Sequence, residues 1–434
     1  MPSTSTSSGR PTPWHPRSPR SSPRSARASG RRSGSAKASL RCDWPIASSR
    51  RWTFRRSADP VGRGILIVAG EASGDAQAAE LAAALRRRDR SVDLYGVGGP
   101  HMRAAGVQTI IDASDLSVMG FAELAGGLTR VWRSYRRVVH EIRNRRPALV
   151  VLVDFPDFNL RLARVAKSAG IPVFYYVSPQ VWAWRRGRVR KIARRVDRMV
   201  VLFPFEVEFY RRYGVDARFV GHPLAETVRA TSTREATRER YGLPAQKPAV
   251  ALLPGSRAKE VRVMLPLMLD AVERLGEDVS CAVACAPGLE PGLVRSLCDR
   301  RGRRVAVAEG DTYNLIAASD AVAVTSGTAT VECALLGAPM VVVYRMSPFS
   351  YAIARSLVRV PFIAMPNLLL SRLVVPELIQ KEATAENLAD RLRRYLEDAE
   401  LRARVAADLG EVRRMLVQPG AADRAAEAAW ELVA

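Results

Sequence analysis

Cysteine and histidine are scarce in this chain of 434 residues, and their spacing argues against a metal centre. The five cysteines form no CxxC pair, and the four histidines form no HxxxH or HExxH pattern. Cys281 and Cys285 fall in a strand-like segment, where residues four apart share a face and are ordinarily small buried side chains. We therefore expect no metal and no cofactor, and the absence of a disulfide pattern favours a reducing compartment, the cytoplasm.

Long apolar runs and common nucleotide signatures are also missing. No stretch approaches the 18 or so apolar residues of a membrane span, so any membrane contact is expected to be peripheral. No Gly-Lys-Ser/Thr triplet marks a Walker A loop, and the nearest approach to G-x-G-x-x-G, residues 96–101, lacks its third glycine. No DxD pair is present to hold a divalent cation on a diphosphate. Dinucleotide binding is therefore poorly supported.

Acidic residues are rare in the first 63 positions, where 14 Lys and Arg face two acids and so contribute +12 of the net charge of +24. This Ser-, Pro- and Arg-rich extension cannot bury enough apolar surface to offset its ordering entropy, so we expect it to be disordered. Three explanations remain open: a start codon assigned too far upstream, a basic arm for anionic lipid or nucleic acid, and a transit peptide. A secretory signal is not expected, because no apolar core segment is present.

From Gly64 onward, short Val-, Ile- and Leu-rich runs alternate with helical patterns. Strands are predicted near 64–69, 91–96, 107–111, 148–153, 172–177, 198–202, 217–220, 248–253, 279–284, 304–307, 320–325 and 338–343. Helices are predicted near 75–88, 121–143, 159–168, 185–195, 205–213, 260–275, 290–300, 327–336, 384–396 and 398–415. Such alternation predicts the α/β class, with parallel sheets covered by helices on both faces.

A polar stretch at 229–240 interrupts the alternation, and the length allows two domains with separate cores. We therefore predict two Rossmann-like doubly wound domains, 64–228 and 229–410, that face each other across a cleft. The remaining segment, 411–434, is predicted to be a helix that packs back on the first domain or on a partner subunit.

The most apolar run of the chain, 148–153, ends at Asp154. A continuous Val-rich run bounded by prolines predicts a strand buried on both faces of a parallel sheet, and ligands bind beyond the carboxyl ends of such strands. Asp154 is therefore the candidate general base. Asp157 is its rival, but Pro156 turns the chain before it.

Three turns between predicted strands and helices are rich in glycine and small hydroxyl residues: 70–75, 254–257 and 325–330. Backbone N–H groups at helix starts attract phosphate, and glycine allows close approach. The second and third turns, with Arg257 beside one of them, predict a diphosphate site in the second domain. The alternative is that these residues only cap helices.

Two further features have open interpretations. The segment 175–186 places aromatic residues before a helix rich in arginine, which suits nucleic-acid stacking, an ordinary core with a solvated face, or contact with anionic lipid. His222 follows a predicted strand, so it either faces the ligand or has a structural role at the hinge between the domains.

Taken together, these loops resemble the lipid-A-disaccharide synthase family of bacterial glycosyltransferases over roughly 64–434. The matching stretches are GEASGD (70–75), GVGGPHM (96–102), DLSVMGFAEL (115–124), DFPDFN (154–159), YYVSPQVWAWR (175–185), FPFE (203–206), GHPL (221–224), LLPGSR (252–257), SGTATVECALLGAPMVVVYR (326–345) and PNLLL (366–370). The first 63 residues lie outside the resemblance.

The resemblance implies the glycosyltransferase-B fold and one step of lipid A and lipopolysaccharide synthesis. In that step 2,3-diacylglucosamine moves from its UDP derivative to the 6-hydroxyl of 2,3-diacylglucosamine 1-phosphate (lipid X), with inversion to a β-1,6 link and without a metal. It implies Asp154 as base and a first-domain loop on the acceptor side: Glu71, Ser73, Gly74 and Asp75. The implied UDP-sugar contacts are Gly255, Ser256, Arg257, Ser326, Gly327, Thr328, Glu332 and Asn367.

Acylated substrates require a site that meets the membrane. The apolar, glycine-punctuated segment 118–128 is followed by four arginines, so we expect Met119, Phe121, Leu124 and Leu128 to contact the inner-membrane surface; a buried helix is the alternative. A possible homodimer is also expected. Two rival functions remain: an enzyme acting on UDP-N-acetylglucosamine without acyl chains, and a basic nucleic-acid-binding module, although no nucleic-acid partner is expected.

Overall fold

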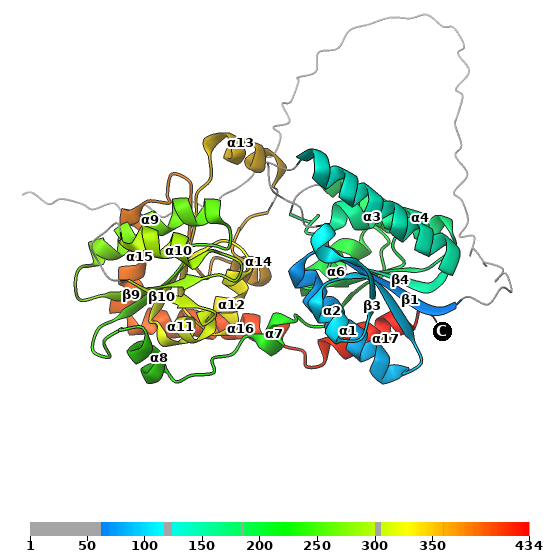
Figure 1. Cartoon of the computed structure of the whole chain (residues 1–434). Coiled ribbons are helices and arrows are strands. Elements are labelled where there is room, and N and C mark those ends of the chain that lie inside the picture. The colour runs from blue at the N-terminus through cyan, green and yellow to red at the C-terminus, as the bar shows by residue number, and fades with distance from the viewer. Residues whose placement is uncertain (1–61, 117–123, 184–185, 300–304, 359, 434) are drawn as a thin grey trace, which may run out of the picture. The chain divides into compact units, whose positions relative to one another are not determined.

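The computed structural model describes residues 62–116, 124–183, 186–299, 305–358 and 360–433, which fold around two parallel sheets (Figure 1). The strands of the first sheet are β1 (Gly62–Ala69), β2 (Asp93–Gly98), β3 (Gln108–Asp112), β4 (Pro147–Val153), β5 (Val173–Tyr176), β6 (Arg198–Val201) and β7 (Ala217–Phe219). Those of the second are β8 (Ala249–Leu253), β9 (Ser280–Cys285), β10 (Ala306–Glu309), β11 (Ala321–Thr325), β12 (Met340–Tyr344) and β13 (Glu377–Ile379).

Helices connect the strands and cover the sheets. Around the first sheet they are α1 (Ala72–Arg88), α2 (Pro100–Ala104), α3 (Leu124–Arg145), α4 (Pro156–Ser168), α5 (Val189–Ala193), α6 (Pro204–Arg211) and α7 (Leu224–Thr227). Around the second they are α8 (Arg234–Arg240), α9 (Ala258–Leu275), α10 (Pro291–Asp299), α11 (Thr312–Ala318), α12 (Ala329–Leu335), α13 (Pro348–Leu357), α14 (Met365–Leu370), α15 (Ala385–Glu397) and α16 (Ala399–Leu416). The last helix is α17 (Ala421–Trp430).

Each sheet is a doubly wound layer with a distinct strand order. The first runs β3-β2-β1-β4-β5-β6-β7 and the second β10-β9-β8-β11-β12-β13, and every strand pair is parallel. We refer to each sheet with its helices as the first and the second domain. This order reverses direction once in each sheet, between β1 and β4 and between β8 and β11.

Strand β4 shows why its sequence is so uniformly apolar. Val150 and Leu152 belong to one core, with residues of α3 and α4, while Val151 and Val153 belong to another, with residues of α1 and α17. Successive side chains of a strand point to opposite faces, so a strand covered on both faces needs an unbroken apolar run. The prediction of a doubly buried strand at this position is confirmed.

Several elements differ from the sequence expectation. The polar stretch 229–240 contains helix α8, because Thr233 caps it: the Thr233 hydroxyl accepts a hydrogen bond from the Ala236 N–H at 3.2 Å. Strand β13 has only three residues, too few for a periodic signal. The helix predicted over 185–195 is present as a 3-10 turn at Arg186–Arg188 that continues into the short helix α5, Val189–Ala193.

The C-terminal segment crosses back to the first domain as a separate helix. Helix α16 ends at Leu416, and Gly420, with a φ of 79°, precedes the next helix. Helix α17 then lies beside α1 (Figure 1). Arg87 of α1 pairs with Asp423, 336 residues away, at 2.6 Å. The alanines of α17 are buried in the core beneath α1: Ala421, Ala425, Ala426, Ala428 and Ala429.

Candidate active site

The predicted site loops follow the four strands at which the two sheets reverse direction. Residues 70–75 follow β1 and Asp154 follows β4, while residues 254–257 follow β8 and 326–328 follow β11. In α/β sheets the connections leave such a strand pair in opposite directions, and ligands bind between the two loops at the carboxyl edge of the sheet. Each domain therefore presents its two predicted loops at the position where α/β sheets bind ligands.

Asp154 is a strained and largely desolvated carboxylic acid. Its φ is 44° and that of the following residue, Phe155, is 45°. Left-handed backbone costs a non-glycine residue about 1–3 kcal/mol and is typical of functional positions. Burial, with a contribution from the negative charge of Glu71, raises the pKa of Asp154 from 3.8 to about 6. A base with this pKa is stronger than an ordinary aspartate and is still ionised at neutral pH.

The first-domain loop lies against the segment that carries Asp154. A Cβ on Gly70 would come within 2.7 Å of the Phe155 ring, so only glycine allows this approach. The next residue, Glu71, is exposed, and its charge acts on Asp154. Glu71 and Asp154, which are 83 positions apart in sequence, therefore form a pair of neighbouring carboxylates. Ser73 is also exposed, on the first turn of α1.

Gly74 and Asp75 have a different character from Glu71 and Ser73. Asp75 is only 1% exposed, and its carboxylate accepts hydrogen bonds from the backbone N–H groups of Gly99, His101 and Met102 at 2.6–3.2 Å. It thus caps α2. Gly74 is buried, and a Cβ atom added at this position would make an ordinary van der Waals contact with Val153. The Asp75 carboxylate is thus engaged within the protein, and Gly74 allows α1 to lie close to the end of β4.

The rival base, Asp157, lies on the surface. Its side chain is 75% exposed and forms an ion pair with Arg188. His222 is 4% exposed, and burial lowers its pKa to about 4. Its Nδ1 accepts from the Leu224 N–H at 3.1 Å, and its ring lies 5.2 Å from that of Phe203. These contacts favour the structural interpretation of His222.

In the second domain, Arg257 is available to an anionic ligand. Its side chain is 79% exposed, and within the described residues it pairs with Glu260, three residues on, at 2.9 Å. Such a surface pair contributes little, so a phosphate can compete for the guanidinium. Gly255 has a φ of 112°, and a Cβ there would meet the Glu260 carboxylate at 2.8 Å. Ser256 is exposed at the start of α9.

The second loop of this domain combines exposed small residues with a half-buried acid. Gly327 has a φ of 151° with open space around it, and Thr328 is exposed before α12. The Ser326 hydroxyl donates to the Ile363 carbonyl at 3.0 Å. Glu332 accepts from the Tyr313 hydroxyl at 3.2 Å, and burial raises its pKa. Among the residues that the structure describes, only one of the two Glu332 oxygens has a hydrogen-bond partner.

Asn367 is fully buried, and its side-chain amide is occupied within the protein. It donates to Val375 O at 2.9 Å and to Glu377 at 2.8 Å, and its oxygen accepts from the N–H groups of Val374 and Val375. Glu377 in turn accepts from the N–H groups of Ile363 and Ala364. The Asn367 side chain thus fixes the 363–367 segment, to which Ser326 is bonded, and its contact with a UDP-sugar stays a prediction.

The expected membrane residues are only partly within the described structure. Met119 and Phe121 lie outside the described residues, as do the side chains of Leu124 and Leu128 in the first turns of α3. The rest of α3 carries an exposed basic face around Trp132, which is 60% exposed with Arg136 stacked 4.8 Å from its ring centre. No helix of the described chain is long and apolar enough to cross a membrane.

The aromatic segment after β5 is mostly core. Tyr175 and Tyr176 are fully buried and Trp182 is 6% exposed, while Trp184 and Arg185 lie outside the described residues. The Trp182 ring donates to the buried carboxylate of Glu206 at 2.9 Å. Buried rings cannot stack with nucleic-acid bases, so for these residues the core interpretation holds.

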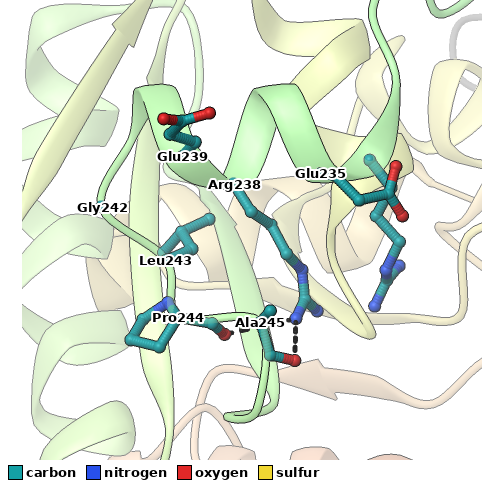
Figure 2. Close-up of a pocket in the computed structure, with 8 residues that line it drawn as sticks. Glu235, Arg238, Glu239, Gly242, Leu243, Pro244 and Ala245 are labelled. Atoms are coloured by element: carbon teal, nitrogen blue, oxygen red, sulfur yellow. Dashed lines mark hydrogen bonds between the residues drawn. The ribbon is translucent and has the colours of Figure 1, made fainter.

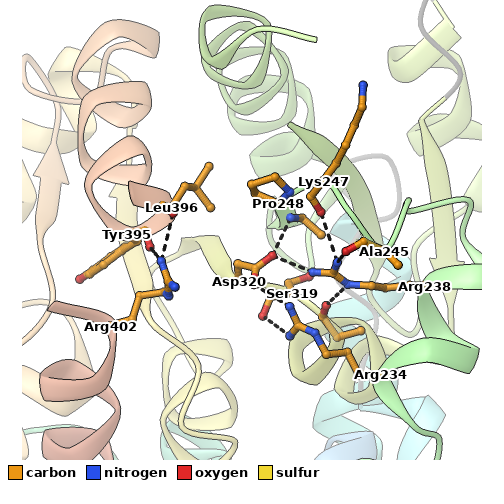
Figure 3. Close-up of polar contacts among 12 residues, drawn as sticks. Arg234, Arg238, Ala245, Lys247, Pro248, Ser319, Asp320, Tyr395, Leu396 and Arg402 are labelled. Carbon is orange, nitrogen blue, oxygen red and sulfur yellow. Dashed lines mark hydrogen bonds and ion pairs between the residues drawn. The ribbon is translucent and has the colours of Figure 1, made fainter. Parts of the chain in front are cut away.

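A cavity of about 450 Å³ lies away from all these loops (Figure 2). Helix α8 and residues 242–245 line it, at the end of the second sheet where β8 and β11 begin. Arg238 fills its floor: the guanidinium donates to Ala318 O at 3.0 Å and to Asp320 at 2.7 Å, as well as to the carbonyls of 244, 245 and 247 (Figures 2 and 3). With its donors occupied, Arg238 ties α8 to the sheet and is not available to a ligand.

Sequence reasoning missed four residues that support the site. Tyr175 and Asn159 both donate to the Asp154 carbonyl, at 2.6 and 2.8 Å, and Glu377 and Tyr313 support the second-domain loops. Asn159 ends the DFPDFN stretch, so its position one turn into a helix after a strand was a usable signal. The role of Tyr175 depends on the β4–β5 register, which no local pattern reveals.

Comparison with known proteins assigns the chain to a family. The family model described as lipid-A-disaccharide synthetase matches residues 65–431. The chain belongs to the lipid-A-disaccharide synthase family. It is 45% identical over 372 residues to the lipid-A-disaccharide synthase of Myxococcus xanthus, with 85% of this chain and 97% of that protein covered. The corresponding enzyme of Anaeromyxobacter dehalogenans is 46% identical over 367 residues, with 84% and 96% covered.

Solved structures with low sequence identity share the fold. A putative UDP-N-acetylglucosamine 2-epimerase from Listeria monocytogenes matches with a TM-score of 0.55 at 14% identity, covering 84% of this chain and 94% of that one. A UGT transferase from Siraitia grosvenorii, in complex with UDP, gives 0.54 at 14% identity, with 85% and 99% covered. The predicted glycosyltransferase-B fold of this family member is confirmed. The family match, and not the fold, separates it from the epimerases.

Proposed function

We propose that the chain transfers 2,3-diacylglucosamine from UDP-2,3-diacylglucosamine to the 6-hydroxyl of 2,3-diacylglucosamine 1-phosphate, with Asp154 as general base. Family membership supports the reaction. The assignment of the residue rests on Asp154, which follows β4 where the strand order of the first sheet reverses. Its backbone is strained and its carboxyl group is desolvated and interacts with the charge of Glu71. Residues 64–228 form the acceptor domain in this proposal, and 229–410 the donor domain.

The proposed step is a single displacement with inversion. The acceptor 6-oxygen attacks the anomeric carbon while Asp154 takes the hydroxyl proton, and the bond from that carbon to the UDP oxygen breaks with its electron pair. Proton removal must be concerted with attack, because a base of pKa about 6 cannot ionise an alcohol beforehand. Negative charge on the departing UDP is met by Arg257 and by the N–H groups that begin α9 and α12, which requires no metal.

Residues on the donor side divide the remaining tasks. Gly255, Ser256, Gly327 and Thr328 supply close backbone approach to the diphosphate. The free oxygen of Glu332 accepts from ribose hydroxyls. Ser326 and Asn367 act indirectly, by fixing the two segments that flank this loop.

Asp154→Asn is the decisive variant, in an assay of both acylated substrates with EDTA present. We expect disaccharide formation to fall by at least 10³-fold while UDP affinity stays within twofold, because the amide cannot accept the proton but preserves shape. Asp157→Asn, on the exposed first turn of the helix that follows Asp154, is the matched control and is expected to retain activity. Undiminished turnover by Asp154→Asn would remove it from the role of base.

The basic face of α3 supports a cytoplasmic, peripheral location on the inner membrane. Exposed Trp132 stands among arginines, an arrangement suited to anionic headgroups, and the acylated substrates reside in that bilayer. Replacing Arg130, Arg133 and Arg136 by Gln is expected to weaken binding to phosphatidylglycerol vesicles at least tenfold, with little change for phosphatidylcholine vesicles. Equal binding to both vesicle types by the unmodified chain would contradict this location.

A homodimer is the remaining part of the proposal. Helix α17 docks on α1 after the break at 417–420, so the same contact can form between two copies by exchange of this helix. Light scattering over a hundredfold range of concentration tests it: a molecular mass that stays at 47.6 kDa throughout would exclude the dimer.

A further inference from the structure

The backbone strain at the site is shared by two neighbouring strand ends. Six non-glycine residues of the described chain have left-handed φ angles, and three of them follow β4 and β5: Asp154 at 44°, Phe155 at 45° and Val177 at 67°. Branched and bulky side chains rarely adopt this conformation. Such a conformation persists only where surrounding contacts hold it, so the contacts of Asp154 identify what maintains the site.

Three hydrogen bonds hold the backbone of Asp154, one through its N–H and two through its carbonyl, which belongs to the Asp154–Phe155 peptide. Its N–H donates to the Tyr176 carbonyl at 3.1 Å, as the continuation of the β4–β5 pairing. Its carbonyl oxygen accepts from the Tyr175 hydroxyl at 2.6 Å and from Asn159 Nδ2 at 2.8 Å. A carbonyl has two lone pairs, so both are occupied and the peptide plane is fixed.

Asn159 makes this arrangement at a cost to its own hydrogen bonding. Its Nδ2 also donates to Val153 O at 3.1 Å, while its Oδ1 is buried with no hydrogen-bond partner within the described structure. Leaving a buried acceptor unpaired destabilises a fold, and turning the amide over would place Oδ1 against two carbonyl oxygens. The Asn159 side chain thus restrains this turn through its Nδ2, while its Oδ1 is left without a hydrogen bond.

We propose that Tyr175 and Asn159 are positioning residues, which together lock the Asp154 carbonyl and thereby aim the Asp154 carboxylate at the acceptor hydroxyl. The inference rests on the proposed function of Asp154. Without the lock, the turn relaxes toward the right-handed region, and the Cα–Cβ bond of Asp154 changes direction. Displacement of a base by about 1 Å can cost on the order of 100-fold in rate.

Tyr175→Phe tests this with the loss of one oxygen atom from a fully buried side chain. We expect kcat to fall at least tenfold, while KM for the UDP-sugar stays within twofold, because the donor loops belong to the second sheet. The acidic limb of the pH–rate profile is also expected to shift, since the carboxylate moves out of its desolvated position. Asn159→Ala is expected to give the same pattern of altered kcat and unaltered KM.

Tyr210→Phe is the matched control. The Tyr210 hydroxyl is equally buried and donates to another backbone carbonyl of the same domain, that of Pro179, at 2.9 Å. It should lose a similar amount of thermal stability while kcat stays within twofold. A kcat for Tyr175→Phe within twofold of the unmodified chain, or a loss equal to that of Tyr210→Phe, would overturn the inference.

Asp154→Asn measured in parallel separates the two proposals. If Asp154→Asn is inactive and Tyr175→Phe is fully active, only the positioning role fails. If Asp154→Asn retains full turnover, the assignment of the base itself fails, whatever the Tyr175 variant does.

Discussion

At the scale of single residues, the raised pKa of Asp154 predicts how activity responds to pH. The base works only when ionised, so kcat/KM is expected to rise tenfold per pH unit below about 6 and to level off above it. The negative charge of Glu71 contributes to the raised pKa of Asp154, so Glu71→Gln should move this rising limb of the pH–rate profile to lower pH. Glu235→Gln, on the exposed surface of α8, should leave it unchanged. A limb that stays in place with Glu71→Gln would show that the two carboxylates do not interact.

Glu206 is a second buried acid, and it predicts how stability responds to pH. Its carboxylate accepts from Ser178, Trp182 and the N–H groups of Leu202 and Phe203, yet burial raises its pKa from 4.5 to about 7. A raised pKa in the folded state means that the folded chain holds the proton more tightly. Its stabilising contribution is therefore complete below pH 4.5 and is lost as the pH rises to about 7, by up to about 3 kcal/mol.

Chemical denaturation at pH 4.5, 6 and 7.5 measures this contribution. The fall in unfolding free energy between these values is expected to be smaller in Glu206→Gln, which has no proton to lose. The Glu206→Gln chain should also be less stable at low pH, because its NH2 group replaces one carboxylate oxygen and so faces two of the four donors. If the unfolding free energy falls equally with pH in both chains, then groups other than Glu206 cause the pH dependence.

Residue types and strand ends were enough to single out some site residues but not their environment. Asp154 and Glu71 stand directly after predicted strands, so their place at a sheet edge followed from the sequence. Their proximity did not, because it depends on the order β1-β4 within the sheet. The resemblance implied that Asn367 contacts the ligand, but it could not show that its side chain is bonded to Val374, Val375 and Glu377, since these contacts join separate segments at the start of a strand too short to predict.

At the scale of elements, α8 and the strands β8 and β11 are joined by one buried guanidinium. The Arg238 side chain is 7% exposed and pairs with Asp320, as Arg234 does from the same helix (Figure 3). Removing one partner of such a buried pair costs on the order of 3–5 kcal/mol, because the remaining charge and carbonyls are left unpaired. Arg238→Met is therefore expected to unfold at a markedly lower denaturant concentration.

The same variant should leave catalysis intact. Arg238 lies where β8 and β11 begin, whereas the donor loops follow the opposite ends of these strands. Arg212→Met, which removes an exposed pair with Glu208, is the control and should cost less than about 1 kcal/mol. KM and kcat are to be measured well below the midpoint of unfolding. If Arg238→Met loses no more stability than the control, then the Arg238 guanidinium does not join α8 to the sheet in the way described.

Most elements could be predicted because their periodic signals are long. The buried strands 148–153 and 320–325 and the helices 260–275 and 384–396 were found within a few residues of their observed bounds. Helix α8 was missed because its residues are almost all polar, so its stability derives from the Thr233 cap and the arginine contacts rather than from an apolar face. Contacts of this kind join distant residues and leave no local pattern.

At the scale of the whole molecule, alternation of strands and helices predicted two parallel sheets, but the strand order within them required the coordinates. That order determines function here, since it places Glu71 beside Asp154 and the Pro254–Arg257 loop beside Ser326. The cavity near α8 lies at the opposite end of the strands from these loops. Ligand chemistry follows the reversal of strand order rather than the size of a hollow.

The return of α17 to the first domain predicts that the last residues of the chain stabilise that domain. Arg198 of β6 is 11% exposed and donates to the Ala428 carbonyl and to Glu431, both at 2.8 Å, and the α17 alanines cover α1. Deleting 419–434 exposes this apolar surface and leaves Arg198 with Asp216 alone. Calorimetry is expected to show a lowered transition for the first domain, with that of the second domain and its UDP affinity nearly unchanged. Glu431→Gln should lower the same transition by less, since it keeps the buried alanines. If the first-domain transition of the truncated chain does not shift, then α17 contacts α1 without contributing to the stability of the first domain.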